Sequence, residues 1–427
     1  MGDYVEIPAL IETLLCRLES SGFAAFTVGG CVRDRLLGRT PTDWDICTAA
    51  KPQTVTRLFS DYTVIPTGIR HGTVTVIVSD MPVEITTFRR DGTYQDSRHP
   101  DSVTFSSDIL EDLKRRDFTV NAMAYSKKRG LVDPFDGRSD LKKGLLRCVG
   151  RAEERFLEDA LRILRALRFA AVYGFSIEPG TAAAMHSCRE RLRRIAAERT
   201  LSELQKMLCG AHLGDIWEKY TDIFAVLFPR MDDPVFAGEC GSRTSASHTL
   251  NTLPPDFALR LAGLFCLYRS SAEKDHLTAC RKTLSDLRCS NALGRQVLPL
   301  LEMQKKPLPQ GLAAVRTLVG QYGFDTADRL FTLQKGIAAC SGDAETLTAA
   351  EDGAALLEKI KRERLCCSIR DLSINGRDLI LAGAVPGPSI QSLLSAALCA
   401  VIEDRVKNEK KALLDFLFCE MPLQFTS

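Results

Sequence analysis

Two aspartates two positions apart, preceded by a pair of glycines, are the residues in this sequence best suited to chemistry on a phosphate. Gly29 and Gly30 follow an apolar segment, and residues without a Cβ let the backbone approach a bound phosphate closely. Asp43 and Asp45 flank Trp44 in a stretch that reads as a short strand. We therefore expect both carboxylates on one face of the strand and the indole on the other. Alone, the aspartates could merely cap a strand, but the two elements in this order favour a phosphate site.

A cation between the two aspartates would offset their mutual repulsion. Mg²⁺ prefers oxygen ligands and bridges carboxylates to substrate phosphates, so it is the expected cofactor. Glu84 lies among apolar and β-branched residues on another predicted strand, where it is either an exposed edge residue or a third carboxylate facing the pair. With the aspartates present we favour the second reading, in which Glu84 ligates a metal or helps remove a proton from an attacking hydroxyl.

A basic segment at 115–122 combines two arginines with an aspartate and an asparagine around one phenylalanine. The guanidinium of Arg116 suits phosphate, and the side chains of Asp117 and Asn121 suit a ribose, whose 2′-hydroxyl both donates and accepts hydrogen bonds. A basic helix start with Asp117 as its N-cap is the simpler alternative, and it is compatible with nucleotide binding.

Asp159 and Arg162 stand three positions apart in a segment with helical periodicity, so we expect their side chains to project together from one helix face. An exposed ion pair would explain this spacing. The alternative is a protein substitute for a pairing base: the carboxylate accepts from the exocyclic amine of cytosine or adenine, and the guanidinium donates to the adjacent ring nitrogen. Guanine and uracil present a carbonyl there, so this pair would accept C and A and reject G and U.

The elements that must position these residues change character along the chain. Residues 7–20 predict a helix, and β-type runs at 25–28, 44–47, 73–78 and 83–88 are separated by turn signals. From about residue 141 the β signals nearly vanish and helical periodicity takes over. We therefore expect a small α/β head followed by a long helical remainder, with loops or boundaries at 229–255 and 305–311.

Composition is that of an ordinary soluble protein, with 427 residues, 26% charged residues and a net charge of +2. Attraction to nucleic acid must therefore come from local patches, and basic clusters do occur between residues 114 and 194. The fifteen cysteines show no spacing typical of zinc sites or of a secreted disulfide framework. Neither a secretory signal nor an apolar run of transmembrane length is evident, so we expect a cytoplasmic protein with no membrane partner.

Four motifs stand in the order typical of one enzyme family: GGCVRDRLLGRTPTDWD (29–45), RRDFTVNAMA (115–124), DPFDG (133–137) and EDALRILRALRF (158–169). A fifth, weaker match lies at 198–204. The chain resembles the class II tRNA nucleotidyltransferases, which are CCA-adding enzymes and bacterial poly(A) polymerases of the polymerase-β superfamily. The resemblance implies an α+β nucleotidyltransferase head with a small mixed sheet, followed by an all-α neck, body and tail. The implied boundaries are 1–138 for the head, 139–215 for the neck, 216–350 for the body and 351–427 for the tail.

The resemblance also implies roles for individual residues. Asp43 and Asp45 would be the metal ligands and Glu84 the third carboxylate, while Asp159 and Arg162 would read the incoming base. The candidate nucleotide-binding residues are therefore Gly29, Gly30, Arg33, Arg116, Asp117, Asn121, Asp159, Arg162, Arg165 and Arg168; all but Gly29, Asp117 and Asn121 match nucleotide-binding positions of the family.

The implied activity is template-independent addition of CCA to the 3′ end of tRNA from CTP and ATP, with Mg²⁺ as cofactor and pyrophosphate as the leaving group. The segment at 67–74 looks like the CCA-adding form, and 88–100 matches the flexible loop that enzymes limited to adding CC lack. Cys266 and Leu267 stand where some members carry a His-Asp pair, so we expect no phosphohydrolase activity. An A-adding enzyme or poly(A) polymerase remains an alternative, and a catalytically silent RNA-binding protein is a second one.

Overall fold

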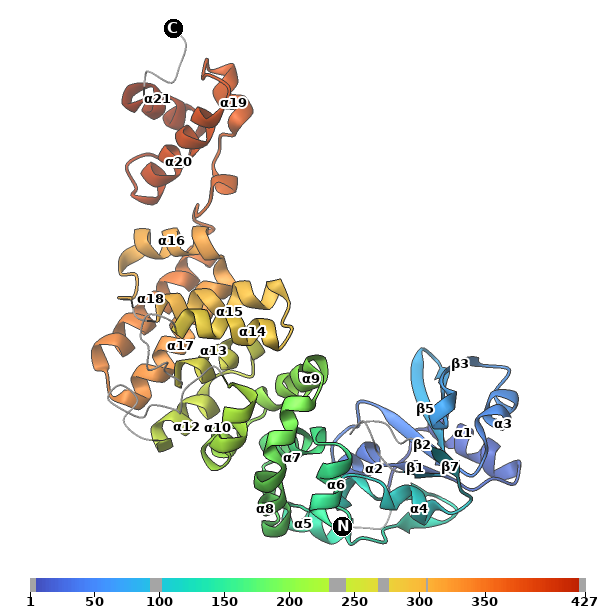
Figure 1. The fold of residues 1–427 in the computed structure, drawn as a ribbon. Helices are drawn as coiled ribbons and strands as arrows, with labels where there is room; N and C mark the ends of the chain where they lie inside the picture. Colours follow the sequence, from blue (N-terminus) through green and yellow to red (C-terminus); the bar gives the residue numbers. More distant parts are fainter. Residues whose placement is uncertain (1–4, 93–101, 230–242, 268–275, 305, 422–427) are drawn as a thin grey trace. The chain divides into compact units, whose positions relative to one another are not determined.

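The chain folds into two units of different secondary structure, Met1–Leu227 and Phe228–Ser427. A computed structural model describes residues 5–92, 102–229, 243–267, 276–304 and 306–421. The first unit contains a β-sheet with helices, whereas the described part of the second contains helices only (Figure 1). The predicted α+β head followed by a helical remainder is therefore confirmed.

A seven-stranded mixed sheet forms the centre of the N-terminal half of the first unit, with strand order β3-β4-β5-β2-β1-β8-β9. Neighbouring strands are antiparallel except β2 and β5, which run parallel. The predicted strands are present, and three others (β3, β8 and β9) were not expected. The strands of the sheet are β1 (Ala25–Val28), β2 (Trp44–Thr48), β3 (Thr63–Gly68), β4 (Thr73–Val78), β5 (Met81–Thr87), β8 (Ala124–Ser126) and β9 (Gly130–Val132).

Helices pack against the buried apolar side chains of this sheet. Helices α1 (Ala9–Ser20) and α3 (Pro52–Leu58) lie side by side next to the strands (Figure 1). Leu113 of α4 (Ile109–Lys114) packs into a core with Phe26 and Cys47 of the two central strands. Helix α2 (Gly30–Leu36) contacts both of these strands, and β6 (Arg89–Asp91) pairs with β7 (Val103–Phe105) beside the sheet.

The rest of the first unit is helical apart from one pair of two-residue strands. Helix α7 packs against α9, and α6 against α8. The helical pattern around 156–169 predicts one helix, but the structure contains two, because α6 ends before Asp159 and α7 begins after Ala160. These elements are α5 (Gly137–Lys143), β10 (Leu145–Leu146), α6 (Ala152–Glu158), α7 (Leu161–Tyr173), β11 (Ser176–Ile177), α8 (Pro179–Cys188), α9 (Ala197–Leu208), α10 (Leu213–Lys219) and α11 (Thr221–Leu227).

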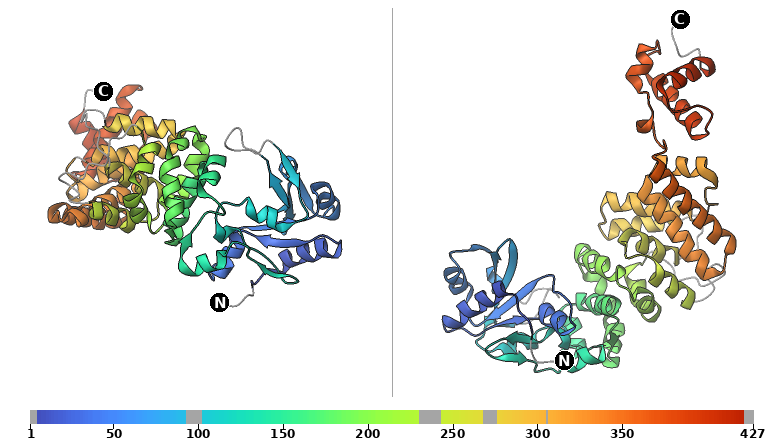
Figure 2. Two further views of the ribbon diagram at one scale, coloured as in Figure 1. Left: turned by 60° about the horizontal axis from the view of Figure 1, so that its bottom comes forward. Right: turned by 180° about the vertical axis from the view of Figure 1, so that it is seen from behind.

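The second unit is a stack of helices, drawn in yellow to red in both views of Figure 2. The loop expected at 229–255 is wrong in part, since residues 243–252 form α12; the described residues between α15 and α16 do form the second expected break. No helix of the described residues is both long and apolar enough to cross a bilayer. The helices are α12 (Arg243–Thr252), α13 (Phe257–Leu267), α14 (His276–Asp286), α15 (Asn291–Met303), α16 (Gly311–Tyr322), α17 (Phe324–Ser341), α18 (Ala344–Glu363), α19 (Gly376–Leu381), α20 (Pro388–Ile402) and α21 (Lys410–Glu420).

Candidate active site

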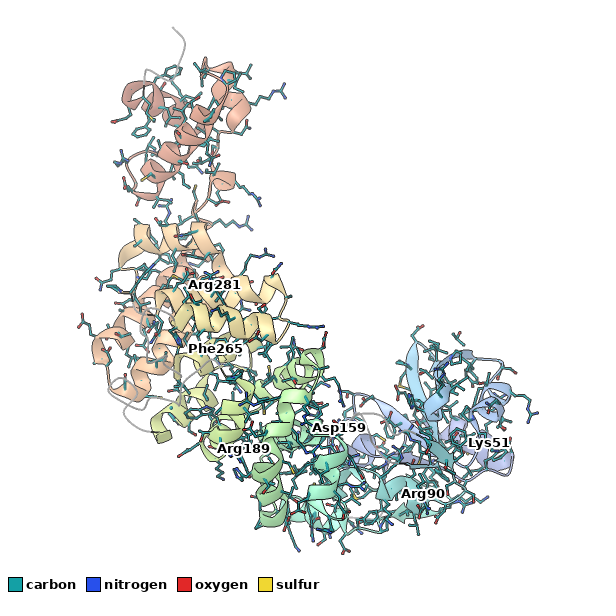
Figure 3. The ribbon with its side chains drawn as sticks, viewed as in Figure 1. Lys51, Arg90, Asp159, Arg189, Phe265 and Arg281 are labelled. Atoms are coloured by element: carbon teal, nitrogen blue, oxygen red, sulfur yellow. The ribbon has the colours of Figure 1, made fainter. Side chains whose placement is uncertain are left out.

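A cavity of about 740 Å³ in the first unit gathers almost all of the candidate residues. Asp159, labelled in Figure 3, lies in it between helices α6 and α7 of the first unit. Glu84 is the one candidate outside the lining. A second cavity of about 970 Å³ lies beside Arg281 in the other unit and contains none of the candidates. The candidates in the first cavity are Gly29, Gly30, Arg33, Asp43, Asp45, Arg116, Asp117, Asn121, Asp159, Arg162, Arg165 and Arg168.

The three carboxylates come from the parallel strand pair in the middle of the sheet. Asp45 on β2 stands directly beside Glu84 on β5, and Asp43 lies just before β2. Trp44 is buried, whereas Asp43 is exposed and Asp45 half-buried, which is the alternation expected of a strand. Burial raises the pKa of Asp45 to about 6; the charges of Asp43 and Glu84 act in the same direction, and Arg116 opposes them.

This arrangement fits a bound cation, because like charges that raise the pKa of a carboxyl are relieved by a positive ion between them. Among the described residues, no three carboxylate, imidazole or thiol groups come close enough together to hold a metal on their own. Asp43 and Asp45 would therefore supply two oxygen ligands, and Mg²⁺, which usually keeps waters and substrate phosphates in its shell, needs no more from the protein.

Gly29 is required at the start of α2 for two separate reasons. Its φ is +81°, a conformation that residues with a side chain rarely adopt, and a Cβ there would lie 2.8 Å from Nη1 of Arg116. Gly30 has room for a Cβ, whose nearest neighbour would be Arg33 at 3.7 Å. The guanidinium of Arg116 in turn donates to the fully buried carboxylate of Asp112 at 3.2 Å. Gly29 thus lets the backbone lie close to the guanidinium of Arg116, which Asp112 holds in place.

Asp117 and Asn121 form a buried polar cluster. Asp117 accepts from the Phe118 amide at 2.8 Å, from Asn121 at 3.2 Å and from Nε of Arg165 at 2.7 Å. Burial alone would raise the pKa of Asp117, but Arg165 and Arg162 lower it to about 2. Asp117 does not begin a helix, so the N-cap reading is wrong: the backbone after it forms a 3-10 turn at Thr119–Asn121.

Asp159 and Arg162 do not project from one helix face, and that expectation is wrong. Asp159 lies in the break between α6 and α7, where its carboxylate accepts from the amide of Leu161, the first residue of α7, at 3.0 Å. Its other oxygen accepts from Arg199 of α9 at 2.7 Å. Arg162 instead donates to Glu158 at 2.8 Å. Both residues still line the same cavity, each held by a partner of its own.

Arg165 and Arg168 follow Arg162 at intervals of three along α7, so they share its cavity face. Glu203 of α9 forms an ion pair with Nε of Arg168 at 2.7 Å. Glu203, Arg199 and Tyr173 line the cavity but were not among the candidates. The first two lie in the weak fifth motif at 198–204, which could have singled them out; Tyr173 carries no such signal. The flexible loop expected at 88–100 lies outside the described residues from 93 onward.

Comparison with known proteins gives matches along nearly the whole chain. Residues 25–147 match the poly A polymerase head domain, 174–233 the probable RNA and SrmB-binding site of polymerase A, and 270–417 the putative tRNA nucleotidyltransferase domain 2. A CCA-adding enzyme of Lactiplantibacillus plantarum is 37% identical over 412 residues, covering 95% of this chain and 94% of that protein. One from Leuconostoc mesenteroides is 50% identical over 200 residues, 47% of this chain and 49% of the relative.

Solved structures agree with the sequence relatives. The crystal structure of the Bacillus stearothermophilus CCA-adding enzyme in complex with CTP has a TM-score of 0.75 and 29% identity, with 97% of each chain covered. The Thermotoga maritima CCA-adding enzyme complexed with tRNA has a TM-score of 0.65 at 21% identity over 96% of this chain and 95% of that one, which shows the fold alone.

Proposed function

Because this chain belongs to the family of CCA-adding enzymes, we propose that it adds C, C and A to the 3′ end of tRNA from CTP and ATP, without a nucleic-acid template. The observation that carries the proposal is that one cavity is lined both by Asp43 and Asp45, which suit a metal, and by Asp159 and Arg162, which suit a base. Phosphoryl chemistry and nucleotide choice would then take place in a single site.

Enzymes of this nucleotidyltransferase family generally use a divalent metal, and we propose Mg²⁺ held by Asp43 and Asp45. When bound, the metal lowers the pKa of the attacking hydroxyl and neutralises charge on the leaving group. Glu84 stands beside Asp45 on the neighbouring strand and is exposed, and we propose that it accepts the proton that the hydroxyl loses. The bond that forms joins the tRNA 3′-oxygen to the α-phosphorus, and the bond that breaks releases pyrophosphate.

Basic side chains on one side of the cavity would hold the triphosphate. Arg33 and Arg116 belong to the head, and each is anchored by a carboxylate, so the guanidinium is oriented before the nucleotide arrives. The backbone amide of Gly30, at the start of α2, would add an N–H donor for a phosphate oxygen, whereas the amide of Gly29 donates to the Met123 carbonyl at 3.0 Å. We propose Asp117 as a contact for a ribose hydroxyl, although its carboxylate already accepts from Arg165, Asn121 and the backbone.

The base would be read at the N-terminal end of α7. The Asp159 carboxylate accepts from the amine of cytosine or adenine, and Arg162 donates to the neighbouring ring nitrogen. Arg199 and Glu158 fix the two side chains, so the reading groups keep one geometry for either base. Guanine or uracil would instead present a carbonyl to the carboxylate. Two hydrogen-bond acceptors would then face each other, which disfavours binding of these two bases.

The test is to incubate the protein with tRNA that ends at the discriminator base, together with CTP, ATP and Mg²⁺, and to sequence the product 3′ ends. We expect CCA ends from the wild type and none from Asp43→Ala. Addition of A without C would identify an A-adding enzyme, and long A tails a poly(A) polymerase. If Asp43→Ala bound tRNA and acted like the wild type, the catalytic proposal would fail. The cytoplasmic location and the four-part boundaries stay predictions.

A further inference from the structure

Tyr173, the last residue of α7, closes a hydrogen-bonded ring with two residues of α2 in the head. Nη2 of Arg33 donates to the Tyr173 hydroxyl at 2.8 Å, and this hydroxyl donates to Oδ1 of Asp34 at 3.0 Å. Nε of Arg33 donates to the same oxygen of Asp34 at 2.9 Å. A fourth contact, from Nη1 of Arg33 to Asn121 at 2.5 Å, ties the ring to the polar cluster of the site.

The aromatic ring of Tyr173 adds a second kind of contact. The guanidinium of Arg33 lies 4.7 Å from the Tyr173 ring centroid and 5.0 Å from that of Phe169, and the guanidinium of Arg39 lies 4.6 Å from the Tyr173 centroid. These distances are within the range of cation–π attraction. Tyr173 therefore contacts two arginines that line the cavity, one of them through both its hydroxyl and its ring.

The Tyr173 hydroxyl remains neutral and so can both accept and donate. Burial raises the pKa of Tyr173; Arg33 opposes this shift and Asp34 adds to it. A neutral phenol accepts from the guanidinium and donates to the carboxylate at the same time. The guanidinium of Arg33 has five N–H donors in a rigid fork, so these contacts fix its plane while leaving charge and an N–H for the cavity.

We propose that Tyr173 is a positioning residue for the nucleotide triphosphate, acting through Arg33. The inference rests on the proposed function, because it takes the ligand of this cavity to be a nucleoside triphosphate. An arginine held in its bound orientation loses less conformational entropy on binding than a free one. Arg162 lies in the first turn of α7 and Tyr173 at its end, so one rigid helix sets the spacing between the base and phosphate ends of the site.

The substitution Tyr173→Phe removes the hydroxyl and keeps the ring. We expect KM for CTP and for ATP to rise together, by about tenfold, because one charge-assisted contact is lost. The Ki of inorganic tripolyphosphate as a competitive inhibitor should rise by the same factor, since it reports the phosphate subsite alone. The kcat and the ratio of CTP to UTP use should stay within twofold. The matched control is Tyr220→Phe, which alters a buried tyrosine of the same unit outside the cavity lining.

A double-mutant cycle separates positioning from a general structural role. In an Arg33→Ala background, adding Tyr173→Phe should leave KM for CTP and Ki for tripolyphosphate unchanged. Additive losses would overturn the inference, as would a Tyr173→Phe variant with wild-type Ki or one in which only thermal stability falls. Failure of the proposed function is a different result, because the wild type would then neither incorporate CTP nor be inhibited by tripolyphosphate.

Discussion

Replacing Asp159 by asparagine should relax the choice of nucleotide more than it slows nucleotidyl transfer. The Asp159 side chain is only 15% exposed, and its carboxylate is fixed by the Leu161 amide and by Arg199. An ionised carboxylate only accepts hydrogen bonds, whereas an amide offers an acceptor or a donor depending on its rotation. Removing one opposed pair of acceptors should make binding of UTP more favourable by about 1–3 kcal/mol. This corresponds to about a 5- to 140-fold rise in kcat/KM for UTP relative to CTP.

Single-nucleotide addition to tRNA lacking its 3′ end measures this effect. The ratio of kcat/KM for UTP to that for CTP should rise by that factor in Asp159→Asn, while kcat for CTP falls by less. Asp222→Asn is the matched control, because Asp222 pairs with His186 in the same unit but lies outside the cavity. Equal losses with all four nucleotides at unchanged ratios would refute the reasoning.

Three further results are expected at neighbouring positions. Asp45→Asn should slow transfer by about a hundredfold or more in a radiolabel assay, and chelation of divalent metal should abolish wild-type activity until Mg²⁺ is restored. Gly29→Ala should weaken CTP binding in titration calorimetry by about tenfold, because its Cβ would displace Arg116; Gly22→Ala, at φ +88° with nothing within 4 Å, is the control that adds backbone strain alone. Asp117→Asn should lower the free energy of unfolding of the first unit at pH 7 by about 2–3 kcal/mol, measured by hydrogen exchange. The pKa of Asp117 is about 2 in the folded protein and about 3.9 in the unfolded chain. The difference in stability between the wild type and Asp117→Asn should therefore have its full size above pH 5 and about half of it at pH 3.

The strands that carry the site were predictable because their residues alternate or form short apolar runs. The β-type runs at 25–28, 44–47 and 73–78 appear as strands with nearly the same bounds. β3 was missed because its segment contains Pro66, which argues against a strand except at the edge of a sheet, where β3 lies. β8 and β9 are three residues each, too short for any periodicity to be visible.

Most of the residues that line the cavity could also be predicted from the sequence. They lie in motifs whose residue types suit phosphate, ribose and base. Their partners were not predictable. Asp159 pairs with Arg199, forty residues along the chain, because α7 packs against α9. Spacing along a single helix predicts only a nearby partner for Asp159, namely Arg162. The break at Asp159 did leave a signal, since an aspartate just before an apolar run is a favoured N-cap.

The partners show how a cavity rich in arginine holds together before any substrate enters. Seven arginines of the cavity lining are each paired with a carboxylate, so each guanidinium is oriented and partly neutralised. No ion pair with a cationic side chain is described for Asp43 or Asp45, the two residues that we propose as metal ligands. Without a metal these aspartates would repel the nucleotide that the arginines attract, so cation binding and nucleotide binding should depend on each other. The paired arginines are Arg33 with Asp34, Arg115 and Arg116 with Asp112, Arg162 with Glu158, Arg165 with Asp117, Arg168 with Glu203 and Arg199 with Asp159.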